Sequence, residues 1–246
     1  MEWVWIIGVA ACVGTAARWW RARQVAHRRT SAELEAVRRI ADEDVTHLGQ
    51  LVQQLGVDVE RAAAADEVRV AHQAALDSSV TARHLWGQVT DAAGISEVTA
   101  TVATGHHAVA CAGALLSGEP VPERRAVCFF DPQHGRSVSD ILWNRGGHGP
   151  RRVPACQHDA ALVADTQQPR IRTVQLGTRT MPYWAAGSAF LAYTKGYFSD
   201  VPTLAWALTE AAVESAPDRP GYFGTGIVGS SGHFDGGGFD GSGAGT

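Results

Sequence analysis

Five side chains in the second half of the sequence have the types and spacing of a metal site. Cys128 is followed six positions later by His134, and Cys156 is followed closely by His158 and Asp159. Thiolate, imidazole and carboxylate are all ligands that tetrahedral zinc accepts. The sequence therefore predicts a metal site with Cys128, His134 and Cys156 as ligands, completed by His158 or Asp159.

A site closed by four protein ligands would be structural, so the expected cofactor is a structural zinc ion. Its binding energy would stabilise a small domain that can build only a limited core. Two other interpretations of the cysteines remain open. Cys128 and Cys156 could form a disulfide in an oxidising compartment, or both could be small buried core residues.

The elements around these residues occur in a suitable order. Residues 138–143 and 151–155 have strand patterns separated by a glycine-rich turn, and residues 157–165 have the pattern of a short helix. A knuckle, a hairpin and a helix whose first turn supplies ligands form a treble-clef module. We therefore expect a small α+β head over residues 119–200.

The head continues with a second expected hairpin, residues 171–176 and 179–183, around Gly177 and Thr178. A glycine at the first position of a two-residue turn is typical of a type II′ hairpin. The aromatic residues over 183–198 predict an irregular cover, which is a candidate partner surface or ordinary core.

The C-terminal end has two further expected parts. A helix is expected within residues 201–216. Residues 217–246 are expected to be a disordered tail, since eleven glycines occur in the last 26 residues and such a composition cannot bury enough apolar surface.

An apolar seam with a mean spacing of 3.5 residues precedes the head and predicts a coiled coil or packed helices. Its members are Leu34, Val37, Ala41, Val45, Leu48, Val52 and Leu55. Gly56 would end this helix, and further helices are expected over residues 62–89 and 95–116, the last ended by Gly118 and Pro120. Residues 31–118 thus predict an antiparallel helical hairpin or three-helix stalk.

Residues 1–30 open with an apolar run from Trp3 to Trp20, close to the length of a membrane span. Five arginines follow within residues 18–30, which by the positive-inside rule predicts a single-pass anchor in the inner (plasma) membrane. The N-terminus would lie outside, the C-terminal body in the cytoplasm, and the lipid bilayer would be a partner. The alternative is a buried N-terminal helix.

Three other potential ligands lie on the expected third helix. His106 and His107 are adjacent and point about 100° apart on a helix, so they cannot easily share one metal. Cys111 lies four positions after His107 and could share its face, although a small buried thiol is the simpler interpretation.

Charge and motifs exclude several enzyme classes. Residues 31–118 carry five arginines against twelve acidic residues, which predicts a solvated exterior. The sequence has no phosphate-binding loop and no glycine-flanked serine nucleophile. Nucleic acid is not an expected partner, and no small-molecule substrate is indicated.

Three segments, CFFDPQHG, VPAC and RTVQLGTRTMPYWAAG, resemble an actinobacterial group of membrane-anchored proteins that has no assigned activity. The resemblance extends from about Asp44 to Phe198. It implies that this part of the chain is one continuous module, and it leaves the chemistry open.

These observations favour a non-catalytic interaction or scaffold protein at the cytoplasmic membrane face, such as an accessory subunit of a membrane assembly. It would bind a protein partner or self-associate through its helical stalk. The alternative is a metal-dependent hydrolase or nuclease, because a hairpin followed by a helix also frames such sites. That alternative would use Asp131, His134, Asn144, His148 and His158.

Overall fold

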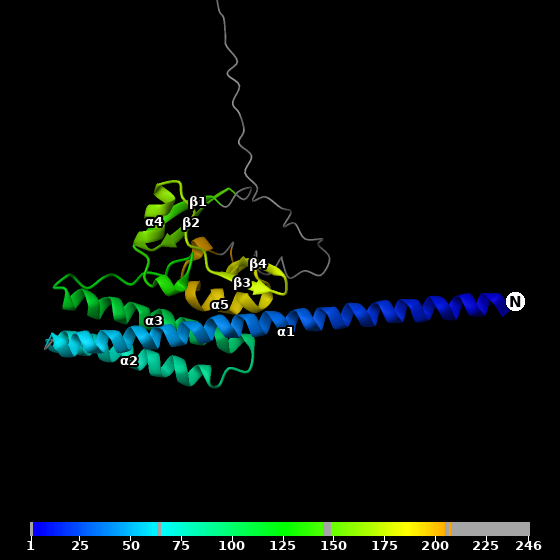
Figure 1. The fold of residues 1–246 in the computed structure, drawn as a ribbon, viewed down its shortest axis with the longest axis horizontal. Coiled ribbons are helices and arrows are strands. Elements are labelled where there is room, and N and C mark those ends of the chain that lie inside the picture. The colour runs from blue at the N-terminus through cyan, green and yellow to red at the C-terminus, as the bar shows by residue number, and fades with distance from the viewer. Residues whose placement is uncertain (1, 63–64, 145–148, 205–206, 208–246) are drawn as a thin grey trace, which may run out of the picture. The chain divides into compact units, whose positions relative to one another are not determined.

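The computed structural model describes residues 2–62, 65–144, 149–204 and 207, and the side chains of these residues except 2–17, 22 and 26–29. This part of the chain is α+β, with five α-helices and two two-stranded antiparallel sheets (Figure 1). The described residues belong to one compact unit. The long helices are α1 (Glu2–Arg61), α2 (Asp66–Trp86) and α3 (Ala92–Leu116).

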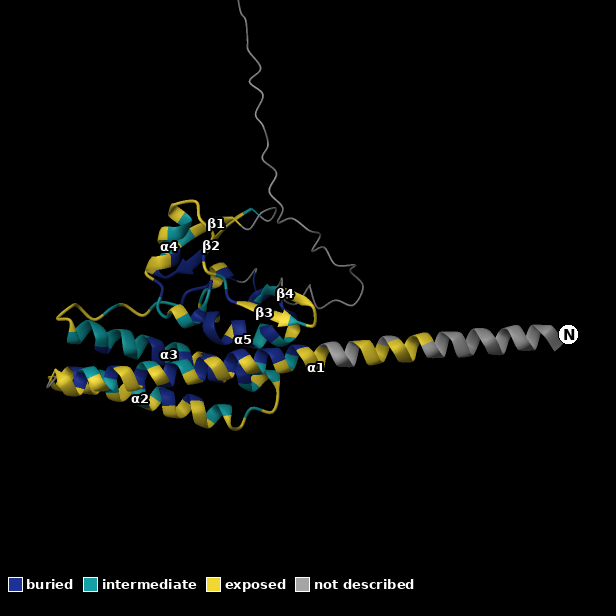
Figure 2. Cartoon of the chain, viewed as in Figure 1, coloured by how far each residue is buried: buried dark blue, intermediate teal, exposed yellow. Residues whose placement is uncertain are grey.

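The three long helices pack side by side through the predicted seam (Figures 1 and 2). From Val37 to Leu55 every seam residue is buried, while Leu34 is half-buried. Asp91 caps α3 by accepting a hydrogen bond from the Gly94 amide at 3.0 Å, as an N-cap residue does. Gly118, with φ +68°, follows the end of α3 and permits the left-handed turn expected there.

Gly56 does not end the first helix, because α1 continues to Arg61. A side chain at position 56 would lie 3.2 Å from the ring of His72 on α2. The glycine therefore lets α2 approach α1, and the Nε2 atom of His72 lies 3.3 Å from the Val52 carbonyl oxygen. Tertiary packing explains this glycine better than a helix cap does.

The predicted membrane anchor is wrong on the present structure. In the part of the chain that the structure describes, no helix is both long and apolar enough to cross a membrane. The run from Trp3 to Trp20 contains two glycines, four alanines and a threonine, which contribute little to membrane transfer. It opens a helix of 60 residues that continues through the arginines. The predicted inner-membrane localisation depended on this anchor and is contradicted by the same finding.

The head follows α3 and contains the first expected hairpin and helix. Strand β1 (Ser139–Asn144) pairs antiparallel with β2 (Pro150–Ala155), so that Ser139 lies opposite Ala155. Helix α4 (Gln157–Ala164) begins directly after β2. These elements lie within two residues of their expected positions, because strand alternation and turn glycines are local signals.

The second hairpin joins β3 (Thr173–Leu176) to β4 (Arg179–Pro182). Gly177 has φ +62°, whereas Thr178 does not have a positive φ. This combination agrees with the expected type II′ turn, since a type I′ turn needs positive φ at both positions.

The aromatic cover is a helix and a core rather than an irregular partner surface. Residues Ser188–Phe198 form α5, preceded by a 3-10 turn at Tyr183–Ala185. Six aromatic residues of this stretch are buried: Tyr183, Trp184, Phe190, Tyr193, Tyr197 and Phe198. Helix α5 packs on α1 and α3 (Figure 1), so head and long helices share one core.

The expected C-terminal helix and tail lie almost wholly outside the described residues. The described part of 201–216 contains a 3-10 turn, Pro202–Leu204, whose Leu204 is buried. Residues 217–246 lie outside the described part of the chain, so the tail stays a prediction.

The close crossing of α3 and α5 depends on Gly196. A Cβ atom there would overlap the Thr99 hydroxyl and the Ser96 carbonyl oxygen. We expect Gly196→Ala to lower the free energy of unfolding by about 1–3 kcal/mol through overpacking, measured by urea denaturation. Gly113→Ala is the matched control, because nothing lies within 4 Å of its Cβ position. Equal stabilities of the two variants would contradict this crossing.

His106 on α3 is buried, and its Nε2 atom has no hydrogen-bond partner among the described residues. Burial lowers the pKa of His106 to about 4; Asp44 opposes this shift, and His47 adds to it. The folded state therefore binds fewer protons than the unfolded state between pH 4 and 6.5. Stability due to the neutral imidazole is present above pH 6.5 and is lost towards pH 4.

We expect His106→Gln to flatten this pH dependence. Between pH 7 and 4 the wild type should lose on the order of 3 kcal/mol more unfolding free energy than the variant. Denaturant unfolding across that pH range measures the difference. His84→Gln removes an exposed imidazole on α2 and serves as the control. Parallel curves for wild type and His106→Gln would contradict the assignment.

Candidate metal centre

Cys128 and His134 lie at the two ends of a tight knuckle. An isolated antiparallel bridge joins Val127 to Arg136, and the Cys128 amide donates to the Gly135 carbonyl oxygen at 2.8 Å. Between Cys128 and Gly135, residues Pro132–His134 form a 3-10 turn. The Asp131 side chain caps this turn by accepting a hydrogen bond from the Gln133 amide at 2.9 Å. This turn, followed by Gly135 at φ +73°, brings the imidazole back towards the thiol across the five-residue spacer.

Cys156 and Asp159 come from the junction of β2 and α4. Cys156 is the N-cap residue of α4, and its Sγ atom accepts from the Asp159 amide at 3.4 Å. Residues three apart in a first helical turn lie on the same face. Asp159 is accordingly buried beside Cys156, whereas His158 points to solvent and is exposed. The structure thus brings Asp159, not His158, to the other three residues.

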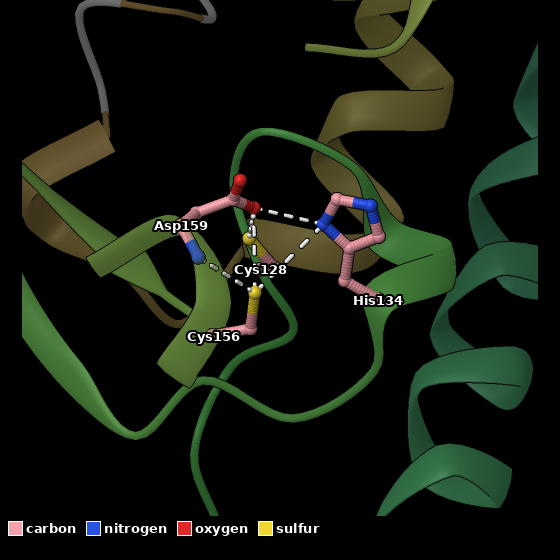
Figure 3. A group of neighbouring side chains, drawn as sticks. All are labelled: Cys128, His134, Cys156 and Asp159. Carbon is pink, nitrogen blue, oxygen red and sulfur yellow. Dashed lines mark hydrogen bonds and ion pairs between the residues drawn. The ribbon is translucent and has the colours of Figure 1, made fainter. Parts of the chain in front are cut away.

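The two segments converge on one point (Figure 3). One potential ligand atom from each of Cys128, His134, Cys156 and Asp159 lies within 4.8 Å of all the others. The Oδ2 atom of Asp159 is central: it lies 3.2 Å from Cys128 Sγ, 3.3 Å from Cys156 Sγ and 2.8 Å from His134 Nδ1. The Cys156 Sγ to His134 Nδ1 distance is 3.8 Å.

These separations fit a tetrahedral ion. Bonds of about 2.0–2.3 Å place sulfur about 3.5 Å from nitrogen or oxygen across a tetrahedral zinc site. Three of the four distances are within about 0.3 Å of that value. Only the imidazole–carboxylate pair is shorter, as expected for a direct hydrogen bond in place of two ligands on one ion. The four separations are therefore compatible with a zinc ion at this point, once the imidazole–carboxylate hydrogen bond is replaced by two bonds to the ion.

The electrostatics also suit a cation. Burial opposes ionisation of Asp159, but the Arg170 amide donates to its Oδ1 atom at 2.9 Å, and together with the two thiols and His134 it lowers the Asp159 pKa. Burial raises the pKa of Cys128 and of Cys156. Both are free thiols rather than a disulfide, and a bound cation would supply the positive charge that favours their thiolates.

His134 is also supported from its outer side. Its Nε2 atom lies 3.9 Å from Asp131 Oδ2, a separation somewhat longer than a hydrogen bond. Metal-binding histidines commonly direct their second nitrogen to a carboxylate. The His134 side chain is 26% exposed, whereas Cys128 and Asp159 are fully buried. The imidazole edge is therefore the side from which an ion could enter.

Among the described residues, the others considered from sequence do not join this group. Asn144 and His158 are exposed. His148 lies outside the described residues. Cys111 is half-buried, with Sγ 3.5 Å from His107 Nε2, so these two do share a face. Neither belongs to the four-residue cluster.

One supporting group was missed by sequence reasoning, and another was given a different role. The Arg170 amide orients Asp159. Asp131, which was assigned from sequence only to the hydrolase alternative, caps the knuckle turn and faces His134. A backbone amide has no sequence signal at all. Asp131 before Pro132 does carry one, because aspartate preceding a proline is a frequent turn and cap residue.

Comparison of the chain with protein-family models, with curated proteins and with solved structures finds no match in any of the three. The interpretation of the site therefore depends on its own geometry.

The adjacent pair His158 and Asp159 offers a matched test of the fourth ligand. We expect Asp159→Asn to weaken zinc binding by more than about 100-fold, since even outer-shell partners cost 10- to 100-fold. His158→Asn should leave the affinity unchanged, because that side chain is exposed. Competition with a chromophoric chelator measures both constants. A larger loss for His158→Asn would mean that the fourth ligand is the histidine.

Proposed function

We propose that this protein binds one zinc ion in a closed Cys2HisAsp site formed by Cys128, His134, Cys156 and Asp159, and that the ion is structural. The observation that carries the proposal is the convergence of four ligand atoms, within 4.8 Å of one another, from two segments about 25 residues apart. Zinc would tie the knuckle to the start of α4 and so stabilise the head on the long helices.

The geometry favours a structural over a catalytic role. Catalytic zinc sites usually have three protein ligands and keep a position open for water or substrate, whereas this site offers four. The cluster contains His134 but neither Asn144 nor His158, two further residues that the hydrolase or nuclease alternative would use. We therefore propose a non-catalytic protein whose surfaces, rather than a reaction, carry its biological role.

The three packed helices support a scaffold role. They give the protein a long, mainly polar exterior, and α2 exposes two large apolar side chains, Val70 and Val80. The three helices share one hydrophobic core with the head, and this core fixes how the helices and the head are oriented. We propose that the protein binds a protein partner, or associates with itself, through these helices.

Metal analysis of the purified protein tests the zinc site. We expect about one equivalent of zinc, a lower melting temperature after chelation, and recovery when zinc is restored. Zinc at 100 times its dissociation constant should add about 2.7 kcal/mol of stability. Cys128→Ser and Cys156→Ser should abolish stoichiometric binding.

Cys111→Ser is the matched control, because the Cys111 thiol lies outside the cluster. It should retain one equivalent of zinc and respond to chelation as the wild type does. A wild-type protein that binds less than about a tenth of an equivalent, with no thermal shift on adding zinc, would end the proposal.

A further inference from the structure

The knuckle that carries His134 also reaches a buried acid on α1. Asp44 is 1% exposed, and the side chain of Gln133 donates to its Oδ1 atom at 3.0 Å. Gln133 immediately precedes His134 in the same 3-10 turn. One short turn therefore has one side chain in the metal centre and the next on the long helix.

Asp44 is the centre of a buried polar network. Tyr193 and Tyr197 of α5 donate hydroxyl hydrogen bonds to its Oδ2 atom at 2.6 and 2.8 Å. Arg172, whose side chain is 8% exposed, donates to Asp44 Oδ1 and to Glu43 Oε2, the latter at 2.8 Å. A buried charge needs such partners, because leaving it without them costs several kcal/mol.

Arg172 completes a second connection to the knuckle. Its backbone amide donates to the Phe130 carbonyl oxygen at 2.8 Å, and its Nη1 atom lies 3.7 Å from Asp131 Oδ1. Asp131 in turn faces His134 Nε2 through its other carboxylate oxygen. The metal centre and the Asp44 network thus touch the same four-residue stretch, 131–134.

We infer that occupation of the metal centre and docking of the knuckle on α1 are energetically coupled through Gln133 and Asp131. The inference rests on the proposed zinc site and adds how the affinity of that site for zinc is regulated. Zinc that fixes His134 also fixes Gln133 against Asp44, so binding tightens the junction of head and helix. By linkage, contacts at Asp44 increase the affinity for zinc by the same factor.

Gln133→Met tests the coupling without touching a ligand. Methionine has a similar length but cannot donate to Asp44, which keeps its three other donors, so the fold should survive. We expect the zinc dissociation constant to rise about fivefold or more with the stoichiometry unchanged. Chelator competition on the full chain, with zinc as the only ligand, measures it.

Val59→Ala is the control for general destabilisation. Val59 is buried in a separate cluster with Leu55, Val68 and Ala112, so its truncation should lower stability and leave the zinc affinity unchanged. Equal dissociation constants for wild type, Gln133→Met and Val59→Ala would overturn the coupling and leave the zinc site standing. Absence of zinc binding by the wild type would overturn both.

A reciprocal measurement needs no substitution. Amide hydrogen exchange in the wild-type protein should slow on adding zinc within residues 131–135 and also on α1 around Asp44, far along the sequence from any ligand. Residues 66–75, which begin α2 and include Val68 of the separate cluster, provide the internal reference. Protection confined to the ligand segments would contradict the coupling even if Gln133→Met fails to fold.

Discussion

A carboxylate buried inside a protein has to be matched by donors, and this requirement at Asp44 organises the molecule. Its partners come from three places that are remote in sequence: Gln133 in the knuckle, Arg172 before β3, and two tyrosines on α5. Removing any one of these segments would leave a buried charge partly unsatisfied. The long helix and the head are therefore held in one arrangement by polar contacts of high directionality, in addition to apolar packing.

An aromatic core packs against the knuckle that carries Cys128 and His134. The rings of Phe129 and Trp184 are tilted by 30° with centroids 4.5 Å apart, and Phe130 meets Trp143 edge to face at 5.3 Å. The Tyr183 hydroxyl donates to the Phe129 carbonyl oxygen at 2.8 Å. Because the residues directly after Cys128 are fixed in this way, its thiol is presented in a rigid position. Rigid support of ligands is what a tight and selective site requires.

Local signals in the sequence predicted much of the head. The hairpins, the start of α4 and the seam of α1 depend on spacing, turn glycines and caps, and these act between near neighbours. The pairs Cys128 with His134 and Cys156 with Asp159 were likewise visible as short-range spacings. The errors have two causes. Gly56 accommodates His72, a residue distant in sequence, rather than ending a helix. The apolar run at the N-terminus opens a long helix that is not apolar enough to span a membrane, because its own glycines and alanines contribute little to membrane transfer.

The sequence alone determined which side chains could bind a metal and in which order knuckle, hairpin and helix would follow, because residue type and local spacing are properties of a short stretch of chain. Tertiary structure alone decided between His158 and Asp159, since the direction of a first-turn side chain has meaning only relative to what faces it. It also decided that Arg172 and the α5 tyrosines meet Asp44, because these contacts join residues 128 to 153 positions apart. No periodicity along a chain encodes a contact of that separation.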